Sequence, residues 1–218
     1  MDIAQLKEIL NSIRDDCLKK DEVRQEIQTI ARKVTRLSKQ AIFLAHKGMT
    51  NEAEYFLKEA NLNLNRIREL LTGYPDLLYG GLIDPALEEY SEAQIFLKII
   101  RDGSFIQPKE IGVPGELYIL GLADVIGELR RRSLDSIRRG DIKEAEKCLD
   151  IMETIYSELI GCDDLMVLIS GLRRKCDVAR RIIEVTRGDV TVEVRRMALN
   201  STMKEFQKFL ERMMNREG

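Results

Sequence analysis

The sequence predicts an all-α protein, in which seven helices form one bundle and the first helix is unusually long. Three observations support this prediction. Prolines are few, at 4 in 218 residues, and glycines fall between periodic segments. Apolar residues recur every three to five positions, as they do on one face of a helix. The strict alternation of apolar and polar residues that indicates a half-buried strand is nearly absent.

The first helix spans about residues 2–47, where apolar side chains recur at helical spacing without proline or glycine. It is either one very long helix or two nearly collinear ones. At 1.5 Å per residue, a helix of about 45 residues spans about 68 Å, well beyond the core of a compact domain of this size. Part of it must therefore project or lie against a second copy, which would have to cover Val23, Ile27, Ile30 and Val34.

Glycine, proline and capping residues delimit the other helices. Gly48 ends the first helix, and Asn51 with Glu54 forms a capping box for a second helix that runs to about residue 72. Asp84 and Pro85 start a third helix, which ends near Gly103. After a turn bracketed by two prolines, four more helices are expected at about residues 117–139, 141–160, 165–187 and 189–215. The stops between them are Gly140-Asp141, the loop 161–163 and Gly188-Asp189.

The composition indicates how many domains to expect and which kinds of site have too few ligands to form. Without an internal repeat, a low-complexity linker or a composition shift, we expect a single domain over residues 1–218. Four cysteines without close-paired spacing and one histidine leave almost no ligands for a zinc site or a catalytic triad, and we expect reduced thiols. No secretory signal and no apolar run of membrane-spanning length are visible. We therefore expect a cytoplasmic protein without a membrane partner.

Two glutamates of the third helix fall within or at the rim of its apolar face. In projection, Glu89 and Glu92 both lie next to Phe96, whereas the solvent side consists of Ser91, Gln94, Lys98 and Arg101. An unpaired carboxylate is costly in such a place, so that a metal ion or a cationic side chain from another helix is expected nearby. The residues alone leave both explanations open.

A second pair of acids lies in the segment 117–132, which is apolar or small on nearly every side. Asp124 and Glu128 stand four residues apart and therefore project from the same side of a helix. One explanation is a divalent-cation site, because hard ions such as Mg²⁺ take carboxylate oxygens. The other is a solvated polar stripe that also includes Asp135.

Clustered arginines are the candidates for binding nucleic acid, because a net charge of −2 requires any such surface to be local. Arg130, Arg131 and Arg132 follow the second acid pair. Arginines also form two adjacent stripes with a seven-residue period, at 173, 180 and 187 and at 174 and 181. These stripes could follow a phosphate backbone, or they could be a solvated face with acidic partners on the same helix. Aromatic residues make up only 6%, so a base-stacking platform is not evident.

Three segments together resemble the translin family. They are Glu-Tyr-Ser-Glu-Ala-Gln-Ile-Phe at 89–96, Tyr-Ile-Leu-Gly-Leu-Ala-Asp-Val-Ile-Gly-Glu-Leu-Arg-Arg at 118–131, and Gly-Asp at 140–141. The resemblance covers nearly the whole chain and implies a translin-like bundle. That family comprises translin, which binds single-stranded nucleic acids, and translin-associated factor X, the Mg²⁺-dependent ribonuclease subunit of their hetero-octamer. The catalytic acids of that subunit lie as Glu-x-x-Glu on one helix and Asp-x-x-x-Glu on the next.

The resemblance therefore implies a metal-dependent ribonuclease that acts on single-stranded RNA, with single-stranded DNA as a second candidate ligand. The ion would be Mg²⁺, with Mn²⁺ as the alternative, and a single-chain member would form a closed homo-octamer with the acids facing its interior. The residues that match the catalytic and metal-binding pattern are Glu89, Glu92, Asp124 and Glu128. The candidates for contacting RNA, none of them transferred from the family, are Arg130, Arg131, Arg132, Arg173, Arg174, Arg180 and Arg181.

Other functions stay open at this point. The chain could be a non-catalytic binding protein of translin type, or a helical scaffold that binds no nucleic acid. Glu88, Glu89 and Glu92 also look like the Glu-Glu-x-x-Glu of all-α nucleotide pyrophosphohydrolases. That family continues with Glu-x-x-Asp, whereas this chain has Asp before Glu and a spacing of four. The last helix carries an apolar stripe suited to assembly, formed by Val194, Met197, Met203, Phe206, Phe209 and Leu210.

Overall fold

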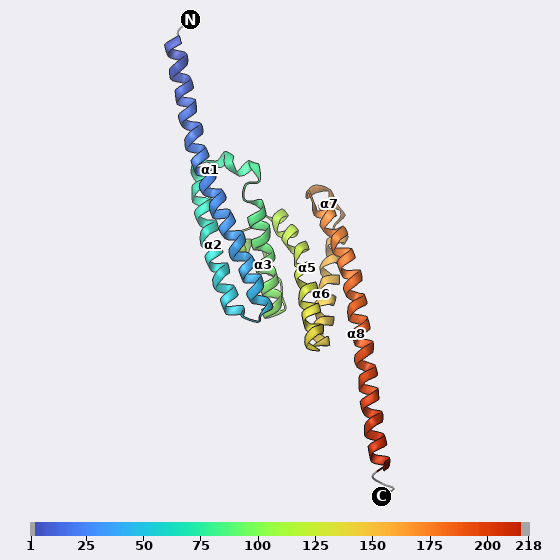
Figure 1. Ribbon diagram of the computed structural model, residues 1–218. Helices are drawn as coiled ribbons and strands as arrows, with labels where there is room; N and C mark the ends of the chain where they lie inside the picture. The colour runs from blue at the N-terminus through green and yellow to red at the C-terminus, as the bar shows by residue number, and fades with distance from the viewer. Residues whose placement is uncertain (1–2, 215–218) are drawn as a thin grey trace. The chain divides into compact units, whose positions relative to one another are not determined.

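The computed structural model describes residues 3–214, with residues 78–80 described only in their backbone, and this part of the chain is helical throughout its regular structure. The all-α prediction is confirmed. The elements are α1 (Ile3–His46), α2 (Thr50–Gly73), the 3₁₀ helix η1 (Pro75–Gly80), α3 (Asp84–Asp102), α4 (Pro108–Ile111), α5 (Gly115–Arg139), α6 (Ile142–Gly161), α7 (Asp163–Leu168) and α8 (Leu172–Met214) (Figure 1). None of the helices within the described range has the length and hydropathy that crossing a membrane requires.

The chain divides into two compact units, residues 1–122 and 123–218, and the boundary falls inside α5. The expectation of a single domain stays a prediction. In the first unit, α1, α2 and α3 pack against one another (Figure 1). The second unit contains the rest of α5 together with α6, α7 and α8, and α8 packs along α6.

The long first helix is one continuous helix of 44 residues with two different halves. Its second half packs into the core of the first unit, where Ile27 and Val34 are buried by the chain's own helices. The expectation that a second copy covers these two residues is therefore wrong. The first half extends beyond α2 and α3 (Figure 1). Its apolar side chains are 50–64% exposed; they are Ile3, Leu6, Ile9, Leu10, Ile13 and Leu18.

The last helix contradicts two predicted boundaries. A helix starting near residue 165 is interrupted, because α7 ends at Leu168 and Gly171 turns the chain with φ of +86° before α8 begins. The predicted break at Gly188-Asp189 is absent, since α8 is helical through both residues. A glycine inside a helix costs only about 1 kcal/mol relative to alanine. Burial of Thr186 and Val190 on either side of Gly188 offsets that cost.

The capping predictions are confirmed at three glycine stops and are wrong at two helix starts. Gly48, Gly103 and Gly140 all adopt positive φ at helix ends, as predicted. The capping box at Asn51 is wrong, because α2 begins one residue earlier, at Thr50, and no side chain caps it. Likewise, Asp84 is the first residue of α3 rather than its cap.

The cysteines agree with the expected reduced state. All four are free thiols. Burial in the core of the second unit raises the pKa of Cys148 to about 12, and burial also raises the pKa of Cys176. These two thiols are therefore inert packing groups at neutral pH.

Candidate functional site

Glu89 and Glu92 occupy half-buried positions on α3, in the first unit, as the helical projection predicts. The side chain of Glu89 is 20% exposed, and its Oε2 lies 3.5 Å from Nζ of Lys39 on α1. The sequence left open whether these acids face a metal or a cation from another helix. Lys39 supplies such a cation at Glu89, and its own side chain is 64% exposed.

The backbone of α3 next to this pair is in close contact with the start of α5. A Cβ atom at Gly121 would lie 2.7 Å from the carbonyl oxygen of Glu88 and 2.9 Å from the amide nitrogen of Glu92. It would also lie 2.8 Å from Cβ of Ser91, which is buried although the projection placed it on the solvent side. The Ser91 hydroxyl donates to the carbonyl oxygen of Leu87 at 2.8 Å. The glycine and the serine thus let two helices approach at their backbones.

Tyr90 lies between the two glutamates in sequence but points into the core, where it is buried. Its hydroxyl accepts a hydrogen bond of 2.7 Å from Nε2 of Gln94. Burial raises the pKa of Tyr90 above its ordinary value, so that the phenol stays neutral at physiological pH. It therefore anchors α3 and does not act as a base.

Asp124 and Glu128 project from α5 in the second unit and are also half-buried. Asp124 Oδ2 lies 2.5 Å from Nζ of Lys175 on α8, and the two side chains are 35% and 24% exposed. Glu128 Oε2 lies 3.7 Å from a guanidinium nitrogen of Arg131, one turn along the same helix. This pair also attracts cationic side chains.

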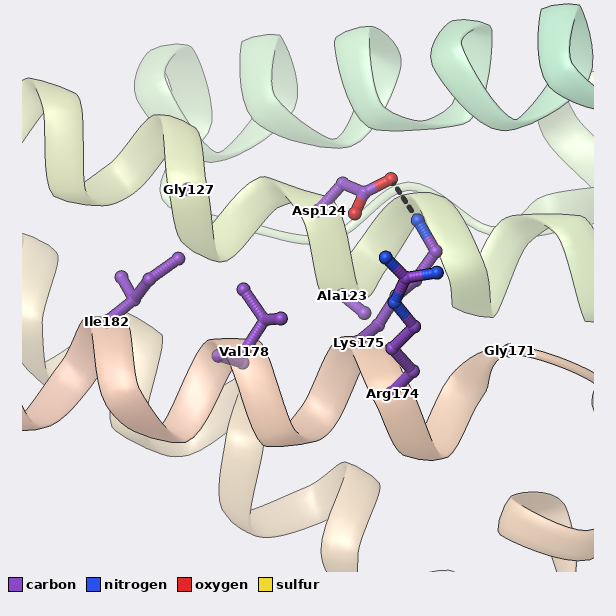
Figure 2. A pocket seen from close by; sticks show the side chains of 9 residues that line it. Ala123, Asp124, Gly127, Gly171, Arg174, Lys175, Val178 and Ile182 are labelled. Carbon is purple, nitrogen blue, oxygen red and sulfur yellow. Dashed lines mark hydrogen bonds and ion pairs between the residues drawn. The ribbon is translucent and has the colours of Figure 1, made fainter.

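A cavity of about 370 Å³ opens beside Asp124, between α5 and α8 (Figure 2). Figure 2 shows the Lys175 ammonium reaching Asp124 from α8 and the Arg174 guanidinium beside it. Val178 and Ile182 form the apolar end of the cavity. One end therefore offers a carboxylate and two cations, and such cations can bind a phosphate. Sequence reasoning named Arg174 but missed Lys175, which continues the same basic run.

The model of the translin family matches residues 22–184 of this chain. The chain belongs to the translin family. An uncharacterised protein from Methanocaldococcus jannaschii is 33% identical over 201 residues, which cover 91% of this chain and 88% of that protein. Translin-associated protein X from Rattus norvegicus is 25% identical over 172 residues, covering 61% of this chain. The match spans 59% of that relative, less than two thirds of its length.

Solved structures of similar proteins have the same fold. The structure of AfC3PO in complex with duplex RNA is 34% identical, with a TM-score of 0.75, and covers 86% of this chain and 98% of its own. The crystal structure of AfC3PO is 35% identical, with a TM-score of 0.76, and likewise covers 86% of this chain and 98% of its own. Apo-NeC3PO is 25% identical, with a TM-score of 0.74, and covers 84% and 96%. The translin-like helical bundle with a long first helix is therefore confirmed.

Two of the arginines that follow the second acid pair make contacts within the protein. Arg130 donates to the hydroxyl of Thr186 at 3.0 Å and lies 3.8 Å from Asp189. Arg132 donates through Nε to Glu144 at 2.6 Å, in a half-buried pair. These contacts hold α5 against α8 and α6. A role for Arg130, Arg131 and Arg132 in contacting RNA stays a prediction.

The arginine stripes of α8 are exposed at Arg173, Arg174, Arg180 and Arg181, whereas Arg187 is paired with Glu153 at 2.8 Å. Their contact with RNA also stays a prediction. Over residues 3–214, no three His, Cys, Asp or Glu side chains form a group that could hold a metal ion. The two acid pairs lie in different units, so that their convergence on one ion stays a prediction as well.

Proposed function

We propose that this chain is a Mg²⁺-dependent ribonuclease that hydrolyses single-stranded RNA within a closed homo-oligomer. Glu89, Glu92, Asp124 and Glu128 would be the metal ligands and the catalytic acids. The observation that carries the proposal is that both pairs are half-buried and that each attracts cationic side chains, at Glu89, Asp124 and Glu128. Half-buried carboxylates of this kind need positive charge.

The donor set fits a hard divalent cation, because four carboxylates offer only oxygen ligands. Bound there, Mg²⁺ or Mn²⁺ would supply an acidified water and neutralise charge at the scissile phosphodiester. The chain's own carboxylates would hold the ion, and the Arg174 guanidinium would orient a phosphate at the mouth of the cavity. Hydrolysis would join the water oxygen to phosphorus and break one phosphorus–oxygen bond to ribose, and a proton from the water would end on the departing ribose oxygen.

RNA as the substrate is supported by the family and by the complex of the relative AfC3PO with duplex RNA. Because that relative was solved with a duplex, the preference of this chain for single strands needs a direct comparison. A second candidate function is a non-catalytic RNA- or DNA-binding protein. The ion pairs of Lys39 and Lys175 favour it, since cationic side chains alone could satisfy two of the acids.

Exposed apolar side chains support assembly. Five apolar side chains of α8 are 44–59% exposed; they are Met197, Met203, Phe206, Phe209 and Leu210. The apolar side chains of the first half of α1 are exposed to a similar degree. Burying such stripes between copies would stabilise an oligomer, most simply the octamer implied by the family resemblance. Light scattering should give the mass of an oligomer at micromolar concentration. A stable monomer, or full activity in a monomeric Phe206→Glu, Phe209→Glu variant, would refute this part.

The test of the function uses labelled single-stranded RNA, the matched duplex and single-stranded DNA, each with Mg²⁺, Mn²⁺ or chelator. We expect metal-dependent cleavage of single-stranded RNA and binding without cleavage in chelator. Log K should fall against log salt with a slope of about −0.7 per phosphate contact. Binding without metal-dependent cleavage would favour the binding protein, and cleavage of the duplex at the same rate would contradict the single-strand preference.

A further inference from the structure

The second half of α1 and the turn after it have an unbalanced positive charge. Residues 27–51 contain no aspartate or glutamate but five lysines and arginines, in a chain whose net charge is −2. These cations therefore lack the interleaved acids that balance the arginines of α8. A regular arginine period does not reveal this segment, because its lysines and arginines are unevenly spaced.

Four of these five cations lie along one exposed side of the segment, three of them on α1 and Lys47 just after its end. Ala31, Val34 and Ala41 bury the opposite face against the rest of the first unit. Residues separated by three or four positions share a helix face. The exposed residues that follow this spacing, which we call the α1 basic face, are Arg32, Arg36, Lys39, Phe43 and Lys47.

The charges of Arg32 and Arg36 are available to a ligand. Lys33, which lies off this face, is paired with Glu59 at 2.8 Å. For Arg32 and Arg36, no carboxylate of the described residues lies within ion-pair distance. Both arginines line a cavity of about 450 Å³ together with Thr29, Ile30 and Lys33. Two guanidinium groups thus lie one helical turn apart on the exposed surface of α1.

The α1 basic face also carries an exposed aromatic ring. Phe43 is 51% exposed, and Nζ of Lys47 lies 5.4 Å from its ring centroid. Arg36 lies seven residues before Phe43 on this face and Lys47 lies four residues after it, so that cations flank the ring on both sides along the helix. Rings of this kind stack on nucleic-acid bases without sequence preference, while neighbouring cations bind the backbone.

We propose that the α1 basic face is an RNA-binding site, in which Arg32 and Arg36 contact backbone phosphates and Phe43 stacks on a base. Lys39 joins this site to the acids, because the same ammonium group lies beside Glu89. The proposal rests on RNA being the ligand under the proposed function, and it adds the residues that bind it. An acidic protein surface is a less suitable ligand for the α1 basic face than RNA. A stable protein interface needs an apolar core, and Phe43 is the one large apolar side chain of the face.

The experiment measures binding of a labelled single-stranded RNA to the full chain by fluorescence anisotropy, in chelator and at several salt concentrations. The double variant Arg32→Ala, Arg36→Ala should bind about tenfold or more weakly, and the slope of log K against log salt should become shallower by about 1.4. Phe43→Leu should bind about fivefold more weakly with an unchanged slope, because it removes stacking and no charge.

The matched control is Arg66→Ala, Lys109→Ala, which removes two exposed cations of the first unit outside the α1 basic face. It should leave affinity and slope near those of the wild type. Circular dichroism and light scattering check that each variant keeps its helices and its subunit count.

Wild-type affinity and slope in the double variant would overturn the proposal, and so would a changed subunit count, which would make the face a contact between copies. These outcomes can be told apart from a failure of the proposed ribonuclease function. If the wild type binds RNA but never cleaves it, the ribonuclease proposal fails and the binding site stands. If the wild type binds no RNA, both fail.

Discussion

The two acid pairs stand on helices of similar burial but are supported in different ways. Beside Glu89 and Glu92, the close contact is between backbones, at Gly121, while the cation Lys39 is mostly exposed and 3.5 Å away. Beside Asp124, the contact is between side chains, since the largely buried Lys175 lies 2.5 Å from the carboxylate inside a cavity. The first pair is thus positioned by the packing of helices and the second by charge.

This difference indicates which changes each pair tolerates. If backbone packing holds the acids, adding side-chain volume at the helix contact should lower the stability of the protein strongly. Removing the nearby cation should lower it only weakly. If a half-buried ion pair holds the acids, removing its cation should lower the stability of the protein. Substituting the acids themselves should affect catalysis at both pairs alike, if all four residues hold one metal site.

The largest expected effect is the loss of cleavage in Glu92→Gln and in Asp124→Asn. Each removes one charged ligand, and we expect cleavage of single-stranded RNA in Mg²⁺ to fall by at least about a hundredfold. Binding in chelator should change much less. Single-turnover assays with labelled RNA measure the first quantity, and anisotropy measures the second.

Matched controls for these variants are Glu88→Gln on α3 and Asp135→Asn on α5, which remove a carboxylate from the same helices outside the predicted set. Both should keep near wild-type cleavage. Loss of RNA cleavage in Glu88→Gln would instead mean that Glu88 belongs to the site and that the predicted set of four acids is wrong. If Glu92→Gln is inactive and Asp124→Asn is fully active, a single site of four acids is wrong.

A smaller effect is expected from added volume at Gly121. Gly121→Ala places a methyl group less than 3 Å from backbone atoms of α3, and overpacking of this kind costs about 1–3 kcal/mol. Gly127→Ala on the same helix meets no atom within 4 Å and should stabilise by about 0.5–1 kcal/mol, because alanine is the better helix former. Thermal unfolding of the two variants gives the comparison. Equal melting temperatures would show that the α3 contact does not hold the first pair.

Much of the fold followed from the sequence because helix periodicity and glycine stops are local signals. The long α1 and the stops at Gly48, Gly103 and Gly140 depend only on residues near them. The continuity of α8 through Gly188 could not be predicted in this way. Burial of Thr186 and Val190 decides it, and burial depends on neighbours that are distant in sequence.

The candidate site could likewise be predicted only as far as local sequence patterns reach. The helical projection placed Glu89 and Glu92 within or at the rim of a buried face, and the structure agrees. For Asp124 and Glu128 the sequence left a solvated stripe open, and the structure makes both half-buried. Spacing could not reveal that Lys39 and Lys175 reach these acids, because each comes from a different helix. Ser91 was misplaced for a similar reason, since only the glycine on a neighbouring helix explains why a serine is buried there. Long-range side-chain contacts are the part that local patterns do not contain.

The smallest expected effects come from the two lysines, and they compare the pairs directly. Lys175→Met keeps the length and apolar stem of the side chain but removes its charge from a half-buried partner, which should cost about 1–2 kcal/mol in chelator. Lys39→Met removes a more distant and mostly exposed cation and should cost less than about 0.5 kcal/mol.

Melting temperatures with and without Mg²⁺ then show whether Asp124 forms only a structural ion pair or also binds a metal ion. If Asp124 binds the ion, Mg²⁺ should raise the melting temperature of Lys175→Met more than that of the wild type, because the metal replaces the missing charge without first displacing an ammonium group. Lys39→Met should respond to Mg²⁺ as the wild type does. Equal unfolding free energies for the two lysine variants would contradict the contrast between the pairs. A Lys175→Met protein that Mg²⁺ does not stabilise would mean that Asp124 is held for structure alone.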